Sequence, residues 1–159
     1  MAFNRMGIIG GVGLVLAALA PAALAQDQAK VLEQRQALMK GIGGNMKALN
    51  EIAKGDREGE PQEVSRRARE INESAKRIAV LFQPEVHIGN VSGDLKTTAK
   101  PEIWTEPEKF RGGVAKLDKA SLDLAAAADS GDKEQIRTAV ADLAKTCGGC
   151  HEVFRVKKQ

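Results

Sequence analysis

Two cysteines and a histidine stand together near the end of the chain, in the run Cys147-Gly148-Gly149-Cys150-His151, and no other cysteine occurs. On a helix, residues three apart share a face, so both thiols can reach the same edge of one planar molecule. The adjacent imidazole can then reach a metal at the centre of that molecule. C-x-x-C-H is the attachment signature of a c-type haem. The spacing therefore predicts one covalently attached haem c, held by Cys147 and Cys150, with His151 as the proximal iron ligand.

Three other interpretations of the motif stay open at this point. A redox dithiol usually begins a helix that follows a strand, whereas this pair ends a helical pattern. A zinc site needs a fourth ligand, and the only other histidine, His87, is far upstream. A structural disulfide suits an oxidising compartment but leaves His151 without a role. In that last case the protein would be a haem-free helical binding module.

The first 25 residues have the order of a secretory signal peptide. Arg5 is the only charged residue before Asp27, residues 8–20 form an apolar run, and residues 23–25 form a small-x-small cleavage site. Cleavage after Ala25 would leave residues 26–159 as the mature domain in the periplasm, where bacteria complete c-type haem attachment. An uncleaved membrane anchor is the alternative, because hydropathy alone does not exclude it.

The expected mature chain is close to neutral and long enough for one domain with its own core. Removing Arg5 from the 24 Lys and Arg residues leaves 23, against 21 Asp and Glu, which is a formal charge of +2. Such a balance requires neither nucleic acid nor an anionic membrane as a partner. We therefore expect no nucleic acid partner, and no membrane partner after signal cleavage.

The mature chain carries four amphipathic helical patterns, in which apolar residues recur at steps of three and four. The first runs from about Asp27 to Lys54, and the second begins near Pro61, which suits a first helical turn. A break over residues 83–106 is long for a small domain, and such loops are usually functional or flexible. The third pattern begins near a possible cap at Thr105. The fourth runs to Phe154.

These patterns predict an all-α protein, an antiparallel four-helix bundle with covalently bound haem. Cys147 and Cys150 fall on the apolar stripe of the last helix, so the haem is expected inside the bundle. The sequence has no evident glycine-rich phosphate loop, paired catalytic carboxylates or Ser/His/Asp order. We therefore expect the protein not to be an enzyme.

The chain resembles the cytochrome c prime family, the class II c-type cytochromes, over nearly all of residues 26–159. The matching motifs are Arg35-Gln36-x-x-Met39, Pro101-Glu102-Ile103-Trp104 and the segment from Cys147 to Arg155. The resemblance implies a periplasmic protein with one haem per subunit, often a homodimer that packs through its first two helices. Its partners would be redox proteins or a diatomic gas, either nitric oxide or carbon monoxide.

The resemblance also implies roles for polar residues around the haem. Arg35 and Gln36 match positions that contact the haem propionates, which suits the bidentate fork of a guanidinium. Lys100 matches a loop position at the haem edge, and Arg155 matches the basic residue beside the proximal imidazole. The alternatives are a solvated helix face for the first pair and an ordinary helix-end charge for Arg155.

Met39 matches the distal position of the family, on the sixth side of the iron. A thioether that binds iron generally raises the reduction potential, and His151 and Met39 would then be the axial ligands of a low-spin electron carrier. A methionine that only fills the core would leave a high-spin, five-coordinate protein that binds nitric oxide or carbon monoxide. We favour electron transfer. His87 is expected in a loop near solvent, and Trp104 in the core.

Overall fold

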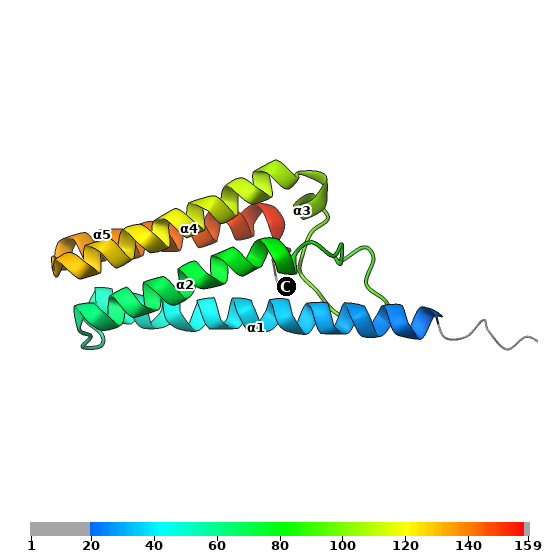
Figure 1. Ribbon diagram of the computed structural model, residues 1–159, viewed down its shortest axis with the longest axis horizontal. Coiled ribbons are helices and arrows are strands. Elements are labelled where there is room, and N and C mark those ends of the chain that lie inside the picture. The colour runs from blue at the N-terminus through cyan, green and yellow to red at the C-terminus, as the bar shows by residue number, and fades with distance from the viewer. Residues whose placement is uncertain (1–19, 158–159) are drawn as a thin grey trace, which may run out of the picture.

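The computed structural model describes the backbone of residues 20–157 and the side chains from residue 24 onward. Four long helices form an antiparallel bundle, and a fifth, short helix lies at one end (Figure 1). The described part of the chain contains no strand beyond one isolated bridge. The predicted all-α four-helix bundle is therefore confirmed. In chain order the helices are α1 (Ala20–Lys54), α2 (Pro61–Leu81), α3 (Glu102–Thr105), α4 (Pro107–Ser130) and α5 (Lys133–Phe154).

Local chemistry sets the ends of the long helices. α1 and α4 each stop at a glycine with positive φ, +80° at Gly55 and +73° at Gly131, a conformation that side chains disfavour. α2 and α4 begin with Pro61 and Pro107, which suit a first turn because its N–H groups have no helical partner. Asp132 caps α5 by accepting bonds of 2.9 and 3.1 Å from the N–H groups two and three residues later.

Two helix boundaries differ from the sequence-based expectation. α1 begins at Ala20 and not near Asp27, so it runs through the expected cleavage site, while residues 1–19 of the expected signal peptide lie outside the described residues. In the expected break over residues 83–106, one helical turn forms as α3.

The expected cap at Thr105 is also wrong. Thr105 ends α3, and Glu106 stands at the cap position of α4 without a side-chain capping bond. A residue before a proline avoids the helical conformation, and Glu106 has φ −121° and ψ 56° ahead of Pro107. This residue therefore separates α3 from α4.

One apolar core joins the four long helices. Each helix contributes a fully or almost fully buried side chain to it, namely Leu49, Ile71, Leu124 and Leu143. α2 and α4 also share buried polar contacts, because the Asn72 amide donates to the backbone and carboxylate oxygens of Asp118 and to the Ser121 hydroxyl. Buried polar bonds between two helices fix their register, since a slip would leave these groups unpaired.

Residues 82–101, which we call the crossing loop, connect α2 to α3 across one end of the bundle (Figure 1). The loop is bonded to the beginning of α1 through Gln28. The Gln28 amide donates to the Asn90 carbonyl at 3.1 Å and accepts from the Ser92 N–H at 2.9 Å. The long break expected between the second and third helices is therefore bonded to the first helix.

We predict that Leu124→Ala lowers the free energy of unfolding of the haem-loaded protein by about 2–5 kcal/mol, because Leu124 is fully buried in the core. Leu122 lies on the same helix and is 46% exposed, so Leu122→Ala should change stability by less than about 0.5 kcal/mol. Denaturant unfolding measures both. Equal losses of unfolding free energy in the two variants would contradict an α4 that buries Leu124 and exposes Leu122.

Candidate functional site

The motif Cys147, Cys150 and His151 occupies the last two turns of α5. Both cysteines are half-buried free thiols in contact with the apolar core. Burial raises the pKa of both thiols, and the proximity of Cys147 raises that of Cys150 further, so both are protonated near neutral pH. The pair is therefore turned toward the bundle, available to a group held between the helices.

His151 follows this pair directly and is exposed as a residue. Partial desolvation of the ring lowers its pKa, and the positive charge of Arg155 lowers it further. The imidazole is therefore mainly neutral at pH 7. A neutral imidazole nitrogen is the form that binds a metal, including haem iron.

α4 leaves room beside Cys150. A Cβ added at Gly113 would lie 3.5 Å from the Cys150 sulfur, whereas one added at the neighbouring Gly112 would meet nothing within 4 Å. Glycine at position 113 thus keeps the surroundings of the sulfur open. Two free thiols, a neutral imidazole and this space fit a planar group bonded through its edge, as the C-x-x-C-H motif predicts.

α1 contributes Met39 to the same region. Met39 is half-buried and packs against the core cluster that Cys147 and Cys150 also contact. A thioether sulfur is a suitable second axial ligand for haem iron. The structure thus brings Met39 and the motif to one apolar cluster, and iron ligation by Met39 stays a prediction.

Arg35 is only 4% exposed, so the solvated helix face considered for it is wrong. Its Nε donates to the Leu81 carbonyl at 2.9 Å, one terminal nitrogen donates to Val86 at 2.8 Å, and the other donates to Pro84. Burial lowers the pKa of Arg35 to about 10, which leaves it charged at neutral pH. Gln36, by contrast, is exposed. The predicted contacts of both residues with haem propionates stay predictions.

The crossing loop returns to the site at Lys100. The Lys100 N–H donates to the Phe154 carbonyl at 3.0 Å, and its Nζ donates to Val153 at 3.1 Å. Ala99 forms an antiparallel bridge with Arg155. These bonds satisfy carbonyls that the end of α5 leaves free. Lys100 therefore caps the helix that carries the motif, while its predicted place at the haem edge, and the role of the exposed Arg155 beside it, stay predictions.

Aromatic rings gather at the end of the bundle where α5 ends, and this grouping was not expected from the sequence. Neighbouring ring centroids are 5.3 to 6.5 Å apart, within the range of aromatic contacts. The sequence did contain an indication of this grouping. α2 and α5 each end close to a phenylalanine, and α4 begins close to one. An antiparallel bundle brings those three ends together. This aromatic cluster consists of Phe82, Trp104, Phe110 and Phe154.

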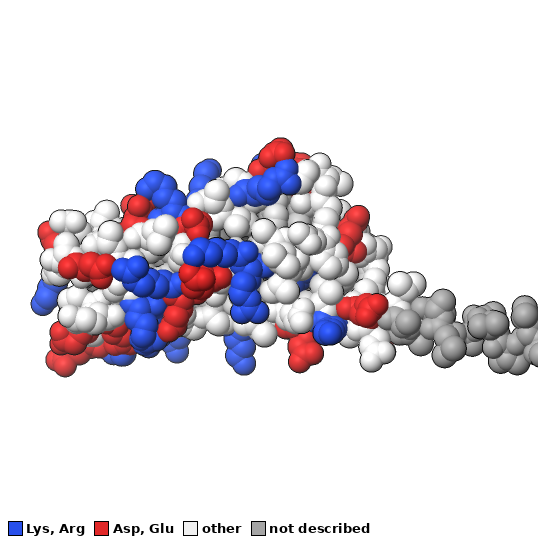
Figure 2. Space-filling model, in the orientation of Figure 1, with Lys and Arg blue, Asp and Glu red and all other residues white. Residues whose placement is uncertain are grey.

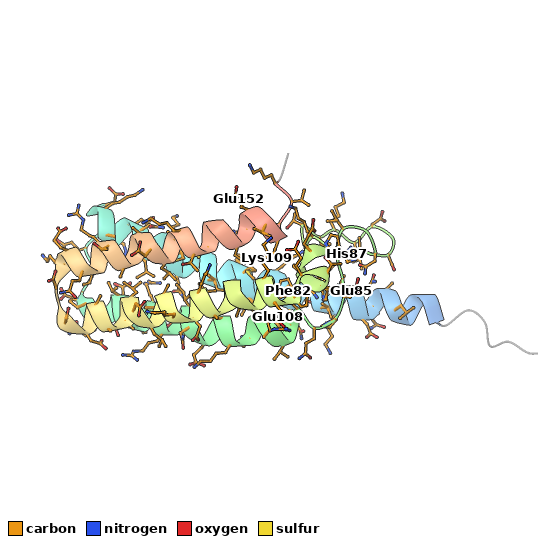
Figure 3. The ribbon with its side chains drawn as sticks, turned by 90° about the horizontal axis from the view of Figure 1, so that it is seen from above. Phe82, Glu85, His87, Glu108, Lys109 and Glu152 are labelled. Atoms are coloured by element: carbon orange, nitrogen blue, oxygen red, sulfur yellow. The ribbon has the colours of Figure 1, made fainter. Side chains whose placement is uncertain are left out.

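His87 and Glu85 lie beside this cluster, next to Phe82 and α3 (Figure 3). The His87 ring is 5.7 Å from that of Trp104, its Nε2 is 3.3 Å from a Glu85 carboxylate oxygen, and its Nδ1 accepts the Gly89 N–H. Both ring nitrogens of His87 therefore have partners within the loop.

Two further observations concern the alternatives. Among the residues that the structure describes, no three His, Cys, Asp or Glu side chains are grouped to hold a metal ion, which gives the zinc interpretation no support. None of the described helices is both long and apolar enough to cross a membrane.

Comparison with known proteins gives consistent results. The family model described as Cytochrome C' matches residues 17–155. A cytochrome c-556 of Rhodopseudomonas palustris is 35% identical over 154 residues, which cover 97% of this chain and 98% of that protein. A cytochrome c' of Pararhodospirillum photometricum is 36% identical over 126 residues, covering 78% of this chain and 94% of the relative.

Solved structures show the same architecture. Recombinant native cytochrome c prime from Alcaligenes xylosoxidans aligns with a TM-score of 0.70 and 22% identity, over 82% of this chain and 97% of that one. A nitric oxide complex of a variant of that protein aligns with a TM-score of 0.71. At this identity the likeness establishes the fold alone.

We predict that Gly113→Leu reduces covalent haem loading severalfold, because its side chain enters the space beside the Cys150 sulfur. Overpacking of this kind costs about 1–3 kcal/mol. Gly112→Leu is the matched control, since the same change there meets open space. The haem-to-protein ratio after purification measures the effect, and equal loading of both variants would show that this space is not used.

Proposed function

The chain belongs to the cytochrome c prime family, which binds covalent c-type haem with one haem per subunit, and from this membership we propose that it is a periplasmic electron-transfer protein. The membership removes the haem-free helical module from consideration. In this proposal the protein is a carrier and not an enzyme. The iron of the bound haem would gain and lose one electron between its ferric and ferrous states.

The observation that carries the proposal is that α1 and α5 bring the Met39 thioether and the Cys147 and Cys150 thiols to one apolar cluster, with His151 next to the thiols in the chain. Cys147 and Cys150 would hold the haem through thioether bonds, and His151 would bind the iron from α5. Met39 reaches the same cluster from α1 and would supply the sixth ligand. A thioether favours the ferrous state and raises the reduction potential. The apolar surroundings exclude water, which suits a site that transfers electrons and does not bind a polar substrate.

The proposed partners are redox proteins. Lys and Arg alternate with Asp and Glu along the bundle, and an uncharged area lies near the end that carries α3 (Figure 2). Such a surface has no strong field of one sign, which suits brief contacts with a partner and gives no reason to expect nucleic acid.

The periplasmic location is supported by the N-terminus and by the lengths of relatives. A cytochrome c-556 of Agrobacterium tumefaciens (strain II Chrys) matches over 127 residues, which are 98% of that protein but only 80% of this chain. The match leaves 32 of the 159 residues of this chain without a counterpart, which is enough to include the 25 residues of the expected signal peptide. Cleavage after Ala25 would leave Gln28, which binds the crossing loop, in the mature protein.

A homodimer through α1 and α2 is proposed as the assembly. The exposed side of α1 carries small residues at Ala37, Gly41 and Gly44, so a second copy could approach the helix closely. On α2, Val80 is 62% exposed. An open hollow of about 710 Å³ beside Gly41 extends over α2. Small residues and an exposed apolar side chain on adjacent helices favour contact with a second protein surface.

The second candidate function is binding of nitric oxide or carbon monoxide at a five-coordinate iron. The nitric oxide complex formed by a variant of the Alcaligenes xylosoxidans protein favours it. In that case Met39 would fill the distal side without binding the metal, as methionine does in many cores.

We predict that Met39→Leu changes the ferric spectrum from low spin to high spin and lets carbon monoxide bind the reduced protein readily. The reduction potential should fall, because the thioether ligand is lost. Leucine keeps the apolar volume, so the packing cost should stay below about 1.5 kcal/mol. Met46→Leu, on the same helix and buried in the core, is the matched control and should leave the spectrum unchanged. If the wild type and Met39→Leu are both high spin and bind carbon monoxide equally, the gas-binding function takes first place.

Sedimentation of the haem-loaded protein at micromolar concentration should give the mass of a dimer. Gly41→Gln should shift it toward monomer, because a long polar side chain then stands on the proposed contact face. Gly112→Gln places the same side chain on α4, where it also meets nothing, and should leave the mass unchanged. A monomeric wild type would contradict the proposed assembly.

A further inference from the structure

The two helices that would hold the haem have no direct polar connection. Met39 lies on α1 and the motif lies on α5, yet no hydrogen bond or ion pair joins these helices among the residues described. The crossing loop is bonded to both. Gln28 and Arg35 bind it from α1, and the segment around Ala99 and Lys100 binds the end of α5. The polar path from one side of the site to the other therefore runs through this loop.

Arg35 makes the buried part of this connection. Its three guanidinium nitrogens donate to the carbonyls of Leu81, Pro84 and Val86, which span the end of α2 and the start of the crossing loop. Val86 is itself only 4% exposed. A buried charge must be compensated by hydrogen bonds, and bonds to charged groups are stronger than neutral ones. Arg35 thus fixes the loop firmly against α1.

Two rings hold the guanidinium in place. Its central carbon lies 4.4 Å from the ring centroid of Phe82 and 5.3 Å from that of Trp104, both within the range of cation–π contacts. The Trp104 indole N–H in turn donates to the Phe82 carbonyl at 2.9 Å. The side chain therefore has little freedom to turn toward another partner.

We propose that Arg35 is a positioning residue, which sets the distance of Met39 from the haem motif by fixing the crossing loop to α1. Met39 lies one helical turn beyond Arg35, so a movement of α1 at one residue moves the other. One N–H group of the guanidinium binds the end of α2 at Leu81 and two bind the crossing loop, which leaves at most two of the five for a propionate. The inference rests on the proposed haem function and assigns Arg35 a role in addition to the predicted propionate contact.

Arg35→Lys in the haem-loaded protein tests the proposal. Lysine keeps the positive charge but lacks the planar fork that reaches three carbonyls at once. We expect carbon monoxide to bind the reduced protein about tenfold faster, the equivalent of one lost hydrogen bond to a charged group. Amide hydrogen exchange should also become faster in residues 84–100. Lys40→Gln, an exposed change on the same helix, should alter neither measurement.

Gln28→Ala separates positioning from direct haem contact. It breaks the other two bonds between α1 and the crossing loop, about two turns from Arg35. It should speed carbon monoxide binding and loop exchange, as Arg35→Lys does, but by a smaller factor. If Arg35→Lys changes carbon monoxide binding while loop exchange and Gln28→Ala show no effect, Arg35 acts directly on the haem and the proposal is wrong. It is also wrong if Arg35→Lys behaves like Lys40→Gln.

Failure of the proposed function gives a different result. A high-spin wild type that binds carbon monoxide as readily as Met39→Leu contradicts that function, and faster loop exchange in Arg35→Lys would then still show that Arg35 fixes the loop. Unchanged exchange would overturn this role as well.

Discussion

The proposed function depends on the separation of α1 from α5, because one planar group would be held between residues of both helices. α5 would fix that group through Cys147, Cys150 and His151, and Asp132 caps the beginning of the same helix. α1 can only approach from the other side. Its approach is limited by the apolar core, which is nondirectional, and by the bonds of Arg35 and the crossing loop, which are directional. The apolar core alone therefore leaves the separation of α1 from α5 undetermined, and the directional bonds of Arg35 and the crossing loop restrict it.

The opposite side of the bundle is organised differently. α2 and α4 share buried polar contacts at Asn72 and Ser121, and further along at Ser65, whose hydroxyl donates to Asp129. The bond between Asn72 and Ser121 would be costly to break, since both side chains would stay buried without a partner. The helix pair α2 and α4 is thus held in register by side-chain bonds that α1 and α5 do not share with each other among the residues described. This division suits a protein that must admit a large rigid group without losing its fold.

Most of the fold could be predicted from the sequence, because periodic apolar residues and the Gly, Pro and Asp signals act locally. The motif residues could be identified because their chemistry depends on spacing along one helix. The contacts of the residues around the motif could not be predicted in this way. In the sequence, Arg35 is one of many charged residues on the predicted helices. Only the fold brings the carbonyls of Leu81, Pro84 and Val86 to it. Helix α3 was missed for the same reason. A single turn has almost no intrinsic stability, and it forms here where Ile103 is buried in the core and Trp104 binds the Phe82 carbonyl.

The bonds of the crossing loop also bear on the order of folding. Those to α1 and α5 join residues 49 to 64 positions apart, whereas α4 and α5 are neighbours linked by a short turn at Gly131. Closing a long segment costs more chain entropy than closing a short one, so contacts between distant residues tend to form late. The helical hairpin that carries the cysteines can therefore form while the end of the bundle is still open. That interval leaves both thiols open to haem attachment before the loop bonds to the end of α5.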